Sequence, residues 1–124
     1  MKQAILLLTA LICTASCTSN ETFTIGKGVN ISHWLSQNDA RGEARKGYFT
    51  RNDVKAIAEM GFDHIRIPID EEQMFDADLN PEPEAFALLH DALGWCGEFE
   101  LRAVVDLHIL RSHHFNATEK PLFT

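Results

Sequence analysis

The sequence predicts an α/β protein that forms the N-terminal part, the first three βα units, of a (β/α)8 barrel. Three short apolar segments typical of buried strands centre on Val29, Ile67 and Leu107, at intervals of 38 and 40 residues. Helical periodicity separates the later segments, and strands that alternate with helices at this spacing form a parallel sheet. No glycine-rich phosphate-binding turn follows any of these strands, so a barrel is favoured over a doubly wound nucleotide-binding sheet.

The first strand is expected at residues 27–31, where Val29 and Ile31 alternate with polar neighbours. Residues 32–35 then lead into a polar, glycine-containing loop that extends to Tyr48.

The first helix is expected to begin at Thr50. Asp53 stands three residues later, which is a variant of the capping box, and Gly61 is a typical C-terminal stop. Between them lies an apolar stripe of Val54, Ile57 and Ala58.

The second strand, residues 64–69, places one arginine among isoleucines. Alternation puts Ile65, Ile67 and Ile69 on one face and Arg66 on the other. An arginine is almost never buried without a partner. Arg66 is therefore expected either to hold a carboxylate at the upper rim of the barrel or to face solvent from an edge strand.

An acidic loop follows over residues 70–84, and a second helix is expected from Pro83 to Cys96, ended by Gly97. The predicted apolar stripe of this helix has helical spacing and consists of Phe86, Leu89, Leu93 and Cys96.

The third strand, residues 101–108, ends in two ionisable residues. Val104, Asp106 and His108 share one face, and the opposite face, with Val105 and Leu107, suits packing under helices. Parallel α/β sheets place their chemistry at the carboxyl ends of strands. His108 therefore either binds a substrate hydroxyl or caps the strand, and Asp106 is expected to be the structural partner of a neighbouring side chain.

Histidines and aromatic residues lie in the loops after the first and third strands. His33, Trp34, His113 and His114 are candidates to line a sugar-sized cleft, and ordinary hydrophobic cover of the barrel is an equal alternative. The spacing of His108, His113 and His114 matches none of the usual zinc patterns, so we expect neither a metal nor a cofactor.

The charge distribution narrows the choice of partner. The 124-residue chain has a net charge of −7, and ten of its eighteen acidic residues lie between Ile67 and Leu101, where no lysine or arginine occurs. A nucleic-acid ligand would require a basic stripe, and an anionic lipid surface would repel this face. A neutral partner fits best.

The first sixteen residues have the features of a secretory signal peptide. Lys2 precedes an apolar run at residues 4–12, and small residues stand directly before Cys17. This resembles a bacterial lipoprotein box, although Thr14 stands where leucine is usual, and ordinary cleavage is the alternative. We therefore expect an exported protein, either a cell-envelope lipoprotein (outer membrane or cell surface) anchored by lipid on Cys17 or a secreted protein. Residues 17–25 would be a tether.

Cysteine use agrees with export. Loss of Cys13 with the signal and lipidation of Cys17 would leave Cys96 without a disulfide partner, as a small buried apolar residue.

Three motifs together resemble the opening of glycoside hydrolase family 5, the family of cellulases with a (β/α)8 fold. They are Gly28–Leu35, Gly61–Pro68 and Val104–His108, and the similarity covers about residues 26–116. The resemblance implies retaining hydrolysis of β-linked polysaccharides by two glutamates about 5–5.5 Å apart. It also implies that Arg66 supports the nucleophile and that His108 contacts the sugar at the cleavage site.

The resemblance further implies that both glutamates follow later strands than residues 26–124 supply. We therefore expect an incomplete catalytic domain that is itself inactive, from an enzyme acting on a cellulose-like β-1,4-glucan or another β-glycan. The alternatives are a non-catalytic, glycan-binding surface lipoprotein derived from the same family and a different barrel enzyme, for example one that acts on a sugar phosphate.

Overall fold

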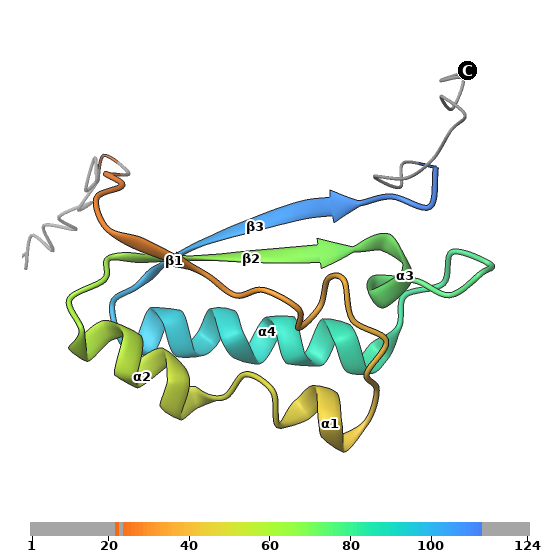
Figure 1. Ribbon diagram of the computed structural model, residues 1–124, viewed down its shortest axis with the longest axis horizontal. Coiled ribbons are helices and arrows are strands. Elements are labelled where there is room, and N and C mark those ends of the chain that lie inside the picture. Colours follow the sequence, from red (N-terminus) through yellow and green to blue (C-terminus); the bar gives the residue numbers. More distant parts are fainter. Residues whose placement is uncertain (1–21, 23, 113–124) are drawn as a thin grey trace, which may run out of the picture.

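The structure is a computed structural model that describes residues 22 and 24–112 (Figure 1). The predicted signal peptide and Cys17 therefore lie outside the described residues. In chain order the elements are β1 (Gly28–Asn30), α1 (Glu43–Lys46), α2 (Arg51–Glu59), β2 (His64–Asp70), α3 (Glu71–Met74), α4 (Pro83–Glu98) and β3 (Arg102–Ile109). In this part of the chain no helix combines the length and apolarity that a membrane span requires.

The three strands form a parallel sheet in the order β1-β2-β3, as predicted. Val29 of β1 lies opposite Ile65 of β2, and Ile65 lies opposite Ala103 of β3, so each strand pairs with the next strand along the chain. Helices α2 and α4 cover one face of the sheet, and no helix of the described chain lies on the other face (Figure 1). This is the layer order of a barrel wall, with helices outside and strands inside.

The capping box predicted at the start of α2 is present. The Asp53 carboxylate accepts hydrogen bonds from the Thr50 N–H at 2.8 Å and from the Thr50 hydroxyl at 2.7 Å. Gly61 follows the helix with φ of 79°, a left-handed conformation that favours glycine. Val54 points from this helix into the core and is fully buried.

The buried face of α4 differs from the predicted stripe. The residues of α4 that are buried are Ala85, Leu88, Ala92 and Cys96. Phe86 and Leu93, which were predicted to face the core, are instead exposed, and Phe86 packs edge-on against Phe75 with ring centroids 5.5 Å apart. The series that contains two alanines faces inward because small side chains let the helix lie close to the sheet. The helix also continues through Gly97, where an end was predicted.

Two short helices, α1 and α3, occupy segments that were predicted to be loops. Each has four residues, which is too short for an apolar periodicity to be visible in the sequence.

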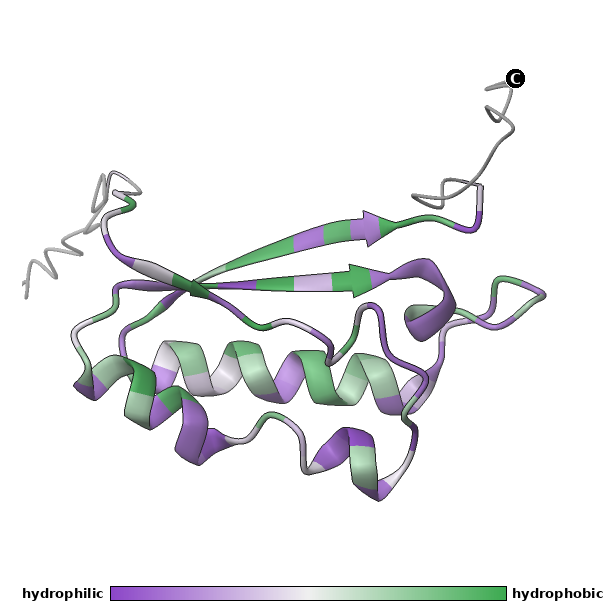
Figure 2. Cartoon of the chain, in the orientation of Figure 1, coloured by the Kyte–Doolittle hydropathy of each residue, from purple (hydrophilic) through white to green (hydrophobic). Residues whose placement is uncertain are grey.

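Strand β3 has an uncovered apolar face. The side chains of Val105 and Leu107 lie on the helix side of the sheet, yet these residues are 42% and 55% exposed. The prediction that this face packs under helices is therefore wrong for the described residues beyond Ala103, which packs against the core. Figure 2 shows hydrophobic residues along both β2 and β3, but only β2 has a neighbouring strand on each edge.

Candidate functional site

Three strands bring four polar side chains together on the face of the sheet opposite the helices. Asn30 of β1 lies opposite Arg66 of β2, and Pro68 of β2 lies opposite Asp106 of β3. His108 follows Asp106 by two residues and so shares its face. We call these four residues, Asn30, Arg66, Asp106 and His108, the inner-face cluster.

Arg66 is the centre of this cluster. Its Nη1 donates to the side-chain oxygen of Asn30, and its Nη2 donates to Oδ2 of Asp106. Strand β2 is the middle strand of the described sheet, so the alternative of an edge-strand arginine facing solvent does not apply. The guanidinium is half-buried and pairs with the Asp106 carboxylate.

Asp106 is shared by Arg66 and His108. His108 Nδ1 lies 3.1 Å from Asp106 Oδ2 and 3.3 Å from Arg66 Nη2. Because a guanidinium can only donate, the Asp106 carboxylate is the acceptor in its pair with Arg66. The expectation that Asp106 is the structural partner of a neighbouring side chain agrees with these contacts.

The predicted loop residues have different positions. His33 is exposed, with φ of 56°, and its Nδ1 lies 3.2 Å from the Gln37 carbonyl oxygen. Trp34 is only 1% exposed, because its ring packs edge-on against Phe49 and its Nε1–H donates to the Arg45 carbonyl at 2.9 Å. The expectation that Trp34 lies over a sugar is not met, since its ring is part of the core.

His113 and His114 lie outside the described residues. The described residues contain no group of three histidine, cysteine, aspartate or glutamate side chains that could hold a metal ion.

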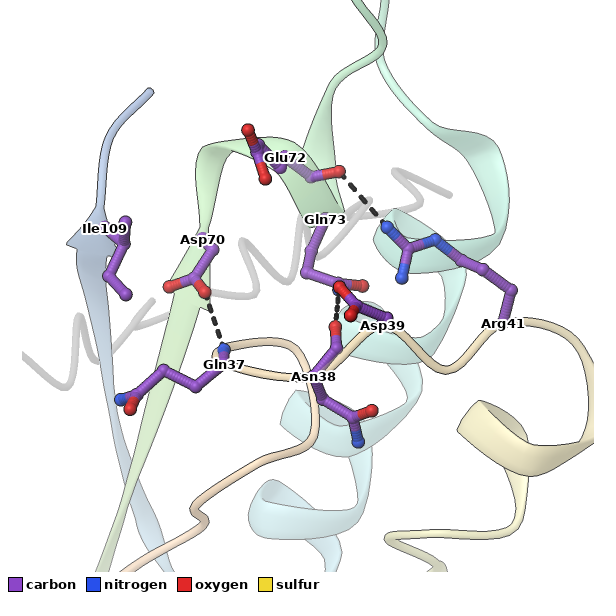
Figure 3. A pocket seen from close by; sticks show the side chains of 8 residues that line it. All are labelled: Gln37, Asn38, Asp39, Arg41, Asp70, Glu72, Gln73 and Ile109. Atoms are coloured by element: carbon purple, nitrogen blue, oxygen red, sulfur yellow. Dashed lines mark hydrogen bonds between the residues drawn. The ribbon is translucent and has the colours of Figure 1, made fainter. Parts of the chain in front are cut away.

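Sequence reasoning missed a polar pocket at the carboxyl ends of β2 and β3 (Figure 3). Its volume is about 200 Å³. Asp70, the last residue of β2, is 8% exposed and its Oδ2 accepts a hydrogen bond of 2.6 Å from the Gln37 N–H. The residues that line this Asp70 pocket are Gln37, Asn38, Asp39, Arg41, Asp70, Glu72, Gln73 and Ile109.

A buried arginine also escaped prediction. Arg45 of α1 is fully buried and donates to Gln73 Oε1 at 3.1 Å, to Glu82 Oε2 at 2.7 Å and to Glu84 Oε2 at 2.6 Å. It therefore ties α1 to α3 and to the start of α4. Nothing in the polar segment around Arg45 distinguishes this residue from a surface arginine.

Arg45 lowers the pKa values of the two carboxylates that it binds, those of Glu82 and Glu84. Its hydrogen bond is the main cause that holds the pKa of Glu84 below the ordinary value. For Glu82 burial raises the pKa, but the Ala85 N–H and Arg45 outweigh it, and the net shift is downward. Both carboxylates are thus held in the charged form that the buried guanidinium requires.

A parallel sheet with helices on one face and a polar cluster on the other places this chain in the α/β class, with the layer order of part of a (β/α)8 barrel wall. No family model matches the chain. Individual relatives do match. It is 32% identical over 93 residues to cellodextrinase A of Ruminococcus flavefaciens. The aligned region covers 75% of this chain and 28% of the relative. It is 30% identical over 92 residues to endoglucanase C of Acetivibrio thermocellus, which covers 71% of this chain and 26% of the relative.

Solved structures agree. A glycoside hydrolase family 5 enzyme from Prevotella bryantii superposes with a TM-score of 0.58 at 22% identity over 68% of this chain and 27% of that one. A trimodular endoglucanase of a family 5 subfamily superposes with a TM-score of 0.54 at 26% identity over 66% of this chain and 16% of that one. These matches support a relationship between this chain and glycoside hydrolase family 5. The chain spans about a quarter of the length of the curated relatives it matches.

Proposed function

We propose that this chain is part of a glycoside hydrolase that cleaves a β-linked glucan by the retaining mechanism. The observation that carries the proposal is the inner-face cluster, in which Arg66 holds Asp106 beside His108, in the second half of β3. The names of the relatives, a cellodextrinase and endoglucanases, support a β-glucan as the substrate.

In this proposal the cluster binds and orients, and the two glutamates of the mechanism belong to other strands of the barrel. Arg66 has five N–H donors in the plane of its guanidinium and already holds one carboxylate, so it is suited to orient a second, the nucleophile. His108 is placed to bond a hydroxyl of the sugar at the cleavage site. His33, exposed on the loop after β1, is proposed as a further substrate contact.

Replacing Arg66 by lysine in the whole gene product tests the proposal. Lysine keeps the positive charge but loses the planar fork, so we expect kcat on a soluble β-1,4-glucan to fall on the order of 100-fold. The measurement is reducing-sugar release, with the unfolding midpoint recorded in parallel. Arg51→Lys, at an exposed ion pair with Glu98, is the matched control and should leave kcat unchanged.

Unchanged turnover in Arg66→Lys would contradict the proposed role. A wild-type product that binds β-glucan without releasing reducing ends would favour the non-catalytic glycan-binding alternative instead.

We also propose that the protein is exported and anchored by lipid on Cys17, on the basis of the apolar run and the small residues that precede this cysteine. Wild-type protein should partition into detergent and Cys17→Ser should not. Equal partitioning of the two would dismiss the anchor.

A further inference from the structure

Asn30 of β1 binds one end of the Arg66 guanidinium. Its side-chain oxygen accepts from Nη1, while Asp106 Oδ2 accepts from Nη2, so the guanidinium is held between an uncharged and a charged acceptor. We propose that Asn30 is a positioning residue, which fixes Arg66 without adding negative charge and so leaves its guanidinium able to bind the nucleophile. The inference rests on the proposed function, because it takes the reaction from it.

The orientation of the Asn30 amide follows from the chemistry of its two partners. A guanidinium can only donate hydrogen bonds, so the atom of Asn30 that faces Arg66 is the carbonyl oxygen. The amide Nδ2 then points away from Arg66 and donates to Ser32 Oγ at 2.8 Å. Turning the amide over would place donor against donor at Arg66.

The segment that carries Asn30 is itself held on both sides. The Ile31 N–H donates to the Arg66 carbonyl at 2.9 Å, which attaches this segment to β2. The Tyr48 hydroxyl donates to the Ser32 carbonyl at 2.9 Å, across 16 residues of sequence. These bonds limit the positions that the Asn30 amide can take, and they make it a fixed support for Arg66.

The charges around Arg66 explain why an uncharged acceptor suits position 30. Arg66 and Asp106 form one ion pair, so their charges balance. A carboxylate at position 30 would make the cluster net negative and would oppose the binding of a further carboxylate. Among the described residues, the titratable side chains that contact Arg66 or line the groove beside Asn30 are those of Asp106, His108, Tyr48 and Asp53.

Asn30→Asp in the whole gene product tests the role of charge. The new carboxylate can still accept from Arg66 Nη1, but it repels a second carboxylate at the same guanidinium. Repulsion raises the pKa of the nucleophile, which must be ionised to react. We therefore expect the acidic limb of the kcat/KM profile to move to higher pH by about one unit. Reducing-sugar release from a soluble β-1,4-glucan over a series of pH values measures this shift.

Asn30→Ala separates positioning from charge. It removes the bond to Arg66 without adding a carboxylate, so kcat should fall by about tenfold with KM nearly unchanged and the acidic limb in place. Ser32→Ala, which removes only the support of the amide, should lower kcat by about threefold. Asn52→Asp makes the same chemical change as Asn30→Asp at an exposed position of α2, and it should match the wild type in kcat and in the acidic limb.

The unfolding midpoint of each variant is recorded in parallel. A purely structural role for Asn30 would lower the midpoint of its variants and leave the acidic limb of Asn30→Asp in place, which would contradict the inference. Full kcat in Asn30→Ala would contradict it as well.

Arg66→Lys in the same assay distinguishes the failure of the two proposals. If Arg66→Lys loses turnover while both Asn30 variants behave like the wild type, only the positioning role of Asn30 is refuted. Unchanged turnover in Arg66→Lys, or no hydrolysis by the wild-type gene product, would overturn the proposed function and the inference together.

Discussion

Strands β2 and β3 have nearly the same sequence design but very different surroundings. Each alternates apolar residues with polar ones, and each directs its polar residues into the inner-face cluster. On the helix side, Ile65 and Ile67 of β2 are fully buried, whereas Val105 and Leu107 of β3 are among the exposed large hydrophobic residues of the described chain. β2 has a strand on both sides, whereas β3 lies at one edge of the described sheet, where α4 contacts it.

The difference shows that strand sequence and strand environment are separate properties. An alternating pattern predicts which face of a strand is apolar. How much of that face is buried depends on the elements that pack against it. The apolar face of β3 has the composition of a buried surface and the exposure of a surface patch, which is typical of a region made to be covered.

The largest expected effect is on the covered strand. Ile67→Ala should lower the free energy of unfolding by roughly 2–5 kcal/mol, because it leaves a cavity in a closely packed core. Val105→Ala, the matched change on β3, should lower it by only roughly 0.5 kcal/mol, because this side chain is already half in water. Urea denaturation followed by circular dichroism measures both. Equal losses would mean that β3 is covered in solution.

An intermediate effect on stability is expected in acid, where the ion pairs of Arg45 with Glu82 and Glu84 are weakened. The pKa values of Glu82 and Glu84 are lowered in the folded state, so their contribution is present above the ordinary value of 4.5 and is lost as pH falls below it. Protonation would leave the Arg45 guanidinium buried with weaker partners. Thermal unfolding between pH 7 and pH 3 should show this decline.

Glu84→Gln is the control for the acid effect, and its stability should fall less steeply over the same range. A parallel decline of the two proteins would assign the acid sensitivity to other carboxylates.

The smallest effect on stability, but a visible one on association, is expected on β3. Leu107→Lys should change the free energy of unfolding by no more than roughly 0.5 kcal/mol, because the side chain is exposed. It should nevertheless reduce self-association of the 124-residue chain, since an apolar edge strand invites pairing and a lysine opposes it. Analytical ultracentrifugation of the variant beside wild type tests this, and unchanged association would exclude the β3 face as its cause.

The elements that local chemistry specifies could be predicted from the sequence. Thr50 and Asp53 define the start of α2, Gly61 defines its end, and alternation correctly assigned Arg66, Asp106 and His108 to one face. Because β2 and β3 are parallel and adjacent, the structure brings these side chains together.

The rest depended on packing that the sequence does not display. In α4 both the predicted and the observed faces are apolar, so hydropathy could not show that Ala85 and Ala92, rather than Phe86 and Leu93, face the sheet. Asp70 was missed because its charge assigned it to the acidic loop after the second strand, whereas it is the last residue of β2.

The continuous register between β2 and β3, from His64 opposite Arg102 to Ile69 opposite Leu107, has a consequence for how this protein can change length. The loops between strands can gain or lose residues without changing which side chains of the next strand face the inner-face cluster. A single insertion or deletion within β3 before Asp106 would turn Asp106 and His108 toward the helix side and bring Leu107 into the cluster. Length variation among natural versions of this segment should therefore be confined to the connections, and strand interiors should differ only by substitution.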